Sequence, residues 1–132
     1  MVGYRTKYFI PAIVYVLLII SLSSLSQATV SKFTWGIEDF LLHAVEYHLF
    51  GITLIWAVLR EKSLHELKPS YRLAVGIGAI SAMADEFYQS FIPGRFSTVE
   101  DVVADVFGLI LSVITFSLLM KIPFLERFRQ NA

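Results

Sequence analysis

Apolar residues gather in four long runs along the chain, and short polar segments separate these runs. The runs cover about residues 8–26, 41–59, 71–92 and 101–120. A helix needs roughly 20 mainly apolar residues to cross a bilayer core of about 30 Å, so each run is long enough to span a membrane. We therefore predict an all-α fold: a polytopic membrane protein built as a bundle of four transmembrane helices with short loops.

The third run is unusual because charged residues interrupt it. "LAVGIGAISAMA" is followed directly by Asp85 and Glu86, so this helix crosses a membrane only if it continues to Ile92. Both carboxylates would then lie roughly 10 Å inside the end of the helix, at about 1.5 Å of rise per residue. Ionisable groups at such a depth are costly and usually functional, so we expect a site here.

The composition agrees with one membrane domain over residues 1–132. Of the 132 residues, 56% are hydrophobic, and the mean hydropathy of +0.66 exceeds that of ordinary soluble domains. The absence of cysteine excludes disulfides, thiolate metal sites and a cysteine nucleophile, and the formal net charge of zero suggests no nucleic-acid partner. The N-terminal run would also fit a secretory signal peptide, but its length and the membranous remainder favour a retained helix.

Basic residues are distributed unevenly over the predicted loops. The N-terminus, the 60–72 loop and the C-terminal tail carry nine of the 11 lysines and arginines, which leaves only Lys32 and Arg95 for the other loops. Lysine and arginine favour the cytoplasmic side of short-looped membrane proteins. We therefore predict that both termini are cytoplasmic and that the 27–40 and 93–100 loops lie outside.

This orientation brings polar residues of three helices to the outer end of the bundle. The residues concerned are His43, Glu46, Tyr47, Asp85, Glu86, Gln89, Asp101 and Asp105. Within each helix they are spaced mainly by three or four positions, which places them on one face, and small residues on the third and fourth helices allow close packing. We predict a polar pocket at the level of the lipid headgroups, with Arg95 presented by the Pro93-Gly94 turn.

Structural roles could account for some of these residues one at a time. Ser97 or Thr98, followed three residues later by Glu100 or Asp101, matches a helix capping box. Asp105 lies too deep in the predicted helix to act as a cap. Convergence from three helices favours a functional site, and a purely structural network is the alternative.

The chemistry of the site stays open at this stage. Arg95 either pairs with Asp85 or Glu86 or grips a phosphate or carboxylate of a ligand with its planar guanidinium. His43 is either a hydrogen-bonded structural histidine or a general base, and Glu86 is the other candidate catalytic base. A histidine among carboxylates could also join them in binding a divalent cation, although no known metal motif is present.

These stretches resemble the VanZ-like family of small membrane proteins. "EDFLLHAVEYHLFG" contains His43 and Tyr47, and "DEFYQSFIPGRFSTVEDVVADVFG" is similar to the family's D-E-x-x-Q, P-G-R, x-S and D-x-x-x-N-x-x-G pattern. The resemblance assigns importance to His43, Asp85, Glu86, Gln89, Pro93, Gly94, Arg95, Ser97, Asp101 and Gly108. Asp105 departs from the pattern because the family usually has asparagine there, which leaves its role open.

The resemblance also implies a biological setting. The family's namesake is associated with resistance to teicoplanin, a lipoglycopeptide, so the chain is similar to proteins of the bacterial cell envelope and is expected in the cytoplasmic membrane. We expect the outer pocket to bind an anionic lipid or a lipid-linked cell-wall precursor, with no certain cofactor and a divalent cation as an option. The alternatives are an intramembrane hydrolase or transferase and an accessory subunit for ion or proton transport. Formation of a homo-oligomer is left open.

Overall fold

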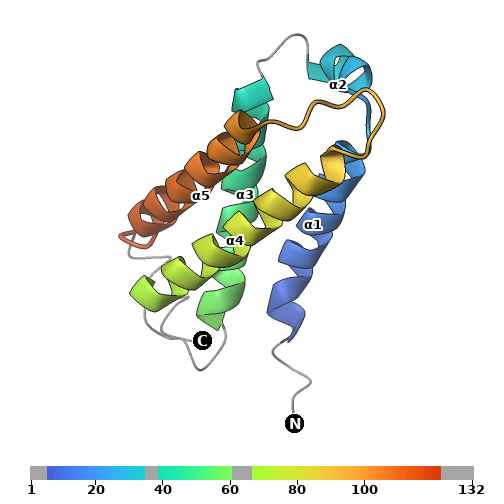
Figure 1. The fold of residues 1–132 in the computed structure, drawn as a ribbon. Coiled ribbons are helices and arrows are strands. Elements are labelled where there is room, and N and C mark those ends of the chain that lie inside the picture. Colours follow the sequence, from blue (N-terminus) through green and yellow to red (C-terminus); the bar gives the residue numbers. More distant parts are fainter. Residues whose placement is uncertain (1–5, 35–38, 61–66, 123–132) are drawn as a thin grey trace.

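The computed structural model describes residues 6–34, 39–60 and 67–122. The elements are η1 (Thr6–Phe9), α1 (Ile10–Ser23), α2 (Gln27–Thr34), α3 (Asp39–Arg60), α4 (Leu67–Gln89) and α5 (Val99–Leu119). Figure 1 shows the long helices α1, α3, α4 and α5 running alongside one another, with the short α2 at one end beside the connection from α4 to α5. The described residues contain no strand, which confirms the all-α prediction for this part of the chain.

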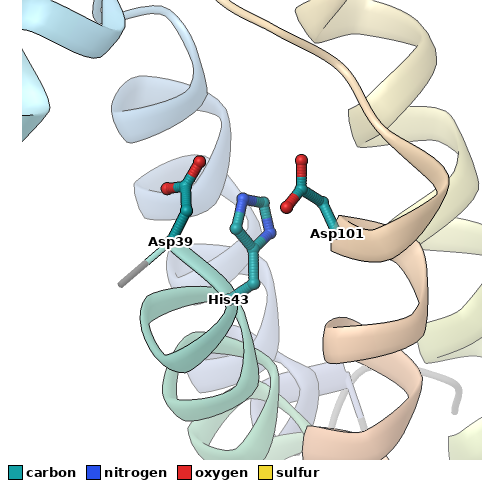
Figure 2. A group of neighbouring side chains, drawn as sticks. All are labelled: Asp39, His43 and Asp101. Carbon is teal, nitrogen blue, oxygen red and sulfur yellow. The ribbon is translucent and has the colours of Figure 1, made fainter. Parts of the chain in front are cut away.

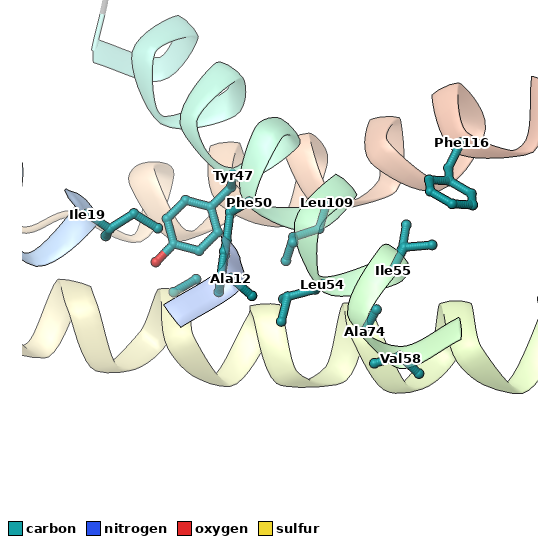
Figure 3. Packing of buried hydrophobic residues seen from close by; sticks show 11 residues of the cluster. Ala12, Ile19, Tyr47, Phe50, Leu54, Ile55, Val58, Ala74, Leu109 and Phe116 are labelled. Carbon is teal, nitrogen blue, oxygen red and sulfur yellow. The ribbon is translucent and has the colours of Figure 1, made fainter. Parts of the chain in front are cut away.

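The hydrophobic core is built around α3. This helix packs against α1, α4 and α5, and its contact with α5 is the most extensive in the bundle. A stripe of buried side chains recurs along α3 every three or four residues, as expected for a helix with a wide apolar face. The stripe comprises Tyr47, Phe50, Leu54, Ile55 and Val58. Figure 3 shows it meeting Leu109 and Phe116 of α5 and Ala74 of α4.

Gly108 allows α3 and α5 to approach each other closely. A Cβ atom at this position would overlap the backbone carbonyl oxygen of Ala44 and would lie 2.9 Å from the backbone nitrogen of His48. Backbone atoms cannot turn aside as a side chain can, so only glycine fits without moving a helix. The close approach matters for the site because His43 precedes Ala44 and Asp105 lies one turn before Gly108.

The segment between the first two long helices differs from the prediction. It was expected to be a loop, but α2 occupies its first part. This helix is short and polar, so the hydropathy pattern that identifies membrane helices does not reveal it. The start of α2 contacts the connection from α4 to α5, because the backbone N–H of Gln27 donates to the carbonyl oxygen of Gly94 at 3.0 Å.

Both ends of α4 also differ from the predicted range of 71–92. The helix begins at Leu67, inside the predicted 60–72 loop. Pro69 does not prevent this start, because it falls in the first turn, where a missing N–H costs no helical hydrogen bond. It ends at Gln89, and the turn that follows contains Gly94 with a φ of +77°. That left-handed conformation suits glycine and reverses the chain toward α5.

Two helices of the described residues, α3 and α5, are long and apolar enough to cross a membrane. The apolar helix Lys7–Ser23 is shorter, and α4 carries Arg72 near its start and two acids near its end. Membrane crossing by the four long helices, and the location of the termini, therefore stay predictions. Large apolar side chains are nevertheless exposed on all four long helices, such as Leu17 (59%), Ile80 (66%) and Phe107 (46%). Such a surface is rare on soluble monomers and agrees with contact with lipid.

Candidate functional site

Polar side chains are buried together at the end of the bundle that lies near α2. They come from four helices: Ser23 from α1, His43 from α3, Asp85, Glu86 and Gln89 from α4, and Asp101 and Asp105 from α5. The sequence predicted that the last three of these helices converge, and Ser23 adds the first. Buried polar groups are costly unless they are hydrogen-bonded, so their partners define what the site can do.

Gln89 is the centre of one hydrogen-bonded chain. Its Nε2 donates to Oδ2 of Asp85 at 2.8 Å and to Oγ of Ser23 at 3.2 Å, and Ser23 Oγ donates to the same Asp85 oxygen at 2.8 Å. Gln89 Oε1 accepts a hydrogen bond from Nε of Arg95 at 2.8 Å. One amide thus connects α1, α4 and the α4–α5 connection, and it fixes the position of the guanidinium group.

Arg95 is held by this neutral amide and not by an acid. Among the described residues, no carboxylate lies within ion-pair distance of the guanidinium, so the predicted alternative of a structural pair with Asp85 or Glu86 is not what the structure contains. Nη1 of Arg95 is buried and has no hydrogen-bond partner among the described residues. The charged end of the side chain therefore keeps donor capacity that a ligand could use.

His43 contacts Asp105 across the interface between α3 and α5. Nδ1 of His43 lies 2.9 Å from Oδ1 of Asp105, and both side chains are buried. A carboxylate in this position orients an imidazole and favours the tautomer with a proton on Nδ1, which leaves Nε2 as the free nitrogen. Oδ2 of Asp105 has no partner within the described part of the chain. Asp105, whose role the sequence left open, is therefore the partner of the histidine.

The connection from α4 to α5 covers Glu86 and also caps α5. The backbone N–H of Thr98 donates to Oε2 of Glu86 at 3.1 Å, whereas Glu86 Oε1 is buried with no partner among the residues described. Thr98 is the N-cap of α5: its Oγ1 accepts from the Asp101 N–H at 3.3 Å and donates to Asp101 Oδ2 at 2.8 Å. The capping alternative thus holds for Asp101, while Ser97 and Glu100 are exposed.

A pocket of about 440 Å³ opens beside His43. Its apolar wall comprises Leu18, Leu22, Leu25, Val30, Leu41, Leu42 and Val45. Its polar lining comprises Tyr15, Asp39, His43, Glu46 and Arg95. A mainly apolar cavity with a few polar groups is the usual form of a small-molecule site, and here it matches a molecule with a long apolar part and a charged group.

Two sets of three residues in the described part could hold a metal ion, and they share His43. In one set, Asp39, His43 and Asp101 offer ligand atoms within 4.8 Å of one another, and Figure 2 shows the imidazole between the two carboxylates. In the other, His43 is joined by Glu86 and Asp105 within the same distance, and all three side chains are buried. The donor atoms are one imidazole nitrogen and two carboxylate oxygens in each case.

Glu46 and Tyr47 follow His43 on α3 but have different surroundings. Glu46 lines the pocket, and its buried Oε1 has no partner in the described chain. Tyr47 is wholly buried in the core, where its ring contacts Phe50 edge-on with centroids 5.8 Å apart. Tyr47 also borders a second cavity of about 390 Å³ together with Asp85. A ligand role for Tyr47 stays a prediction, and its packing role is direct.

Sequence reasoning did not single out Ser23, Gln27 or Asp39 as members of the site. Ser23 stands in the serine-rich "SLSSLS", and nothing in that string tells which hydroxyl faces inward. Gln27 Nε2 donates to Oδ2 of Asp39 at 2.9 Å, a contact that depends on the unpredicted α2. Asp39 could have been found, because it lies four residues before His43, but the helix was predicted to begin at residue 41.

The fold and the buried network define an all-helical protein with an apolar-walled pocket and a polar cluster at one end of the bundle. A family model described as VanZ/LLP1 matches residues 6–120, and the chain belongs to this family. The match includes all five α-helices and confirms the resemblance found in the sequence. No curated protein and no solved structure matches the chain.

Proposed function

We propose that this VanZ/LLP1 protein binds a membrane amphiphile that carries an anionic headgroup, with the headgroup at Arg95 and the apolar part along α1 and α3. The ligand class is an anionic phospholipid or a lipid-linked cell-wall precursor. The observation that carries the proposal is the pocket beside His43, in which one arginine meets a wall made mostly of leucine and valine side chains. A ligand without an apolar part would not be stabilised by contact with such a wall.

The state of Arg95 supports a phosphate or carboxylate ligand. Its Nε is engaged by Gln89 at 2.8 Å, which positions the guanidinium, while Nη1 has no partner among the described residues. A buried donor left without a partner is costly, and an anionic oxygen would satisfy it with a charge-assisted hydrogen bond. Two of the other polar groups at the pocket, Asp39 and Glu46, are acids and would repel an anionic group placed away from Arg95, so a single headgroup phosphate beside Arg95 fits best.

The cellular setting belongs to the same proposal. Two apolar helices of membrane-spanning length and the exposed apolar side chains support a protein of the bacterial cytoplasmic membrane. The bias of lysine and arginine supports cytoplasmic termini and an outward-facing pocket. At the outer surface, a lipid anchor, its headgroup and a lipoglycopeptide such as teicoplanin would all be within reach of the site. The proposal includes a link to glycopeptide resistance, which this location and the family support.

One observation favours a second function, an intramembrane hydrolase or transferase acting on the same lipid. His43 faces the pocket and contacts Asp105 at 2.9 Å, which is the arrangement of a general base with an orienting acid. In this case Nε2 of His43 would accept the proton of an attacking water or alcohol. Turnover of a candidate lipid that disappears in His43→Ala, with lipid retention unchanged, would favour the enzyme over the binding protein.

The proposal is tested by native mass spectrometry of the full chain purified in mild detergent. Three forms are compared: wild type, Arg95→Ala and the control Arg72→Ala, which removes an exposed arginine near the other end of α4. A hydrogen bond to a charged group contributes about 1.5–3 kcal/mol, so Arg95→Ala should retain its lipid roughly 10- to 100-fold less well. Arg72→Ala should resemble wild type. Equal retention of one phospholipid or isoprenoid-phosphate class by all three forms would overturn the proposal.

A further inference from the structure

We propose that His43, Glu86 and Asp105 form a binding site for a divalent transition-metal ion, Zn²⁺ or Mn²⁺, within the helical bundle. One residue comes from each of α3, α4 and α5, so the site exists only in the packed structure. Each residue can offer one ligand atom such that the three atoms lie within 4.8 Å of one another. Metal–ligand bonds of about 2.0–2.2 Å require ligand atoms closer than this, which small side-chain rotations can provide.

The carboxylates of Glu86 and Asp105 can each accept one more ligand or hydrogen bond. Glu86 and Asp105 are 4% and 0% exposed, and each keeps one oxygen, Oε1 and Oδ2 respectively, with no hydrogen-bond partner among the described residues. The other oxygen of Glu86 accepts from the Thr98 N–H at 3.1 Å, and Oδ1 of Asp105 lies 2.9 Å from His43 Nδ1. An ion shared by His43 and Asp105 would bind Nδ1 in place of its proton, because the Nε2 lone pair is directed away from a group that faces Nδ1. Unpaired carboxylate oxygens at this depth are costly, and a single cation would satisfy both together.

The charge balance around the site also favours a cation. Four carboxylates are buried in this cluster, those of Asp85, Glu86, Asp101 and Asp105. Among the described residues, the only basic side chains that accompany them are His43 and Arg95, and Arg95 makes its hydrogen bond to an amide. A divalent ion would offset two negative charges in a low-dielectric environment, where uncompensated charge is most costly.

The donor atoms indicate which ions fit. One imidazole nitrogen and two carboxylate oxygens suit Zn²⁺ or Mn²⁺ better than Ca²⁺ or Mg²⁺, which prefer oxygen donors alone. The alternative set of Asp39, His43 and Asp101 has the same chemistry. It is less favoured, because Asp39 is only half-buried and neither of its acids has an oxygen that is buried without a partner.

This inference does not depend on the lipid proposal, and its readout is separate. The purified full chain would be stripped with a chelator and dialysed against Zn²⁺ or Mn²⁺, and the bound metal would be measured by mass spectrometry of the element. Wild type should hold about one ion per chain, as expected for a site with three protein ligands and an open position. If wild type bound the metal but retained no lipid, the result would count against the lipid proposal alone.

Isosteric variants assign the ligands. Glu86→Gln and Asp105→Asn should each weaken binding at least tenfold, whereas the control Glu100→Gln, which changes an exposed acid in the first turn of α5, should stay within about threefold of wild type. The metal affinity of Asp39→Asn should also stay near that of wild type. If Asp39→Asn lost the metal while Glu86→Gln still bound it, the assignment would be overturned in favour of the other set. Absence of uptake of either ion by wild type would overturn the proposal outright.

One measurement needs no variant and therefore no assumption that a variant folds. Pulsed electron paramagnetic resonance of Mn²⁺ bound to wild type reports directly coordinated nitrogen. In the described residues of this cluster, His43 is the imidazole within reach of the carboxylates, so nitrogen coupling is the expected result. A bound Mn²⁺ with oxygen ligands only would contradict the triad.

Discussion

The closest contact between α3 and α5 provides a sharp test of how the site is assembled. In Gly108→Ala, the added methyl group would overlap the backbone carbonyl oxygen of Ala44 and approach the backbone nitrogen of His48 to 2.9 Å. Neither atom can rotate away, so the two helices must separate. The control is Gly76→Ala on α4, because a Cβ there meets nothing within 4 Å.

The magnitude follows from comparing the two variants. Replacing glycine by alanine inside a helix favours folding by up to about 1 kcal/mol, and this gain is common to both positions. Overpacking typically costs about 1–3 kcal/mol, and the cost applies to Gly108→Ala alone. Gly108→Ala should therefore be less stable than Gly76→Ala by about 1–3 kcal/mol, roughly 4 °C in Tm for each kcal/mol in a domain of this size.

Thermal unfolding in detergent, followed by circular dichroism, measures this difference. The separation of α3 from α5 should also disturb the 2.9 Å contact between His43 and Asp105, which flank the close approach on either helix. Loss of metal or lipid binding in Gly108→Ala, with both retained in Gly76→Ala, would be the functional counterpart. Equal Tm values for the two variants would refute the reasoning, since the backbone overlap would then have no energetic consequence.

Two further predictions concern single polar residues, and the same unfolding experiment measures both. Gln89→Leu removes the amide that joins Ser23, Asp85 and Arg95, and we expect a loss of about 1–3 kcal/mol because buried partners are left unsatisfied; an unchanged Tm would show that these groups find other partners. Thr98→Ala removes the cap of α5 and should cost about 0.5–2 kcal/mol, whereas Thr98→Ser, which keeps the hydroxyl, should restore most of it.

Much of the architecture could be read from the sequence, because a long apolar run predicts a helix from its own residues, without knowledge of its neighbours. The predicted ranges for α3 and α5 agree with the observed helices to within two residues at each end. The polar positions that would share a face were also predictable, since the spacing of three and four residues fixes it. The short α2 was missed because its eight residues contain too few apolar positions to show a helical period, and tertiary contact with Gly94 holds it.

By itself, the sequence determined the helical class, the family and which acids, histidine and arginine gather at one end of the bundle. It could not determine the pairing of those groups. That Arg95 is held by an amide, that His43 meets Asp105 and that Thr98 caps the helix through Asp101 are results of packing. Spacing along a helix fixes only which face a residue occupies. The rotation and separation of neighbouring helices decide which atoms meet, and the close approach at Gly108 sets the separation of α3 and α5 beside the contact of His43 with Asp105.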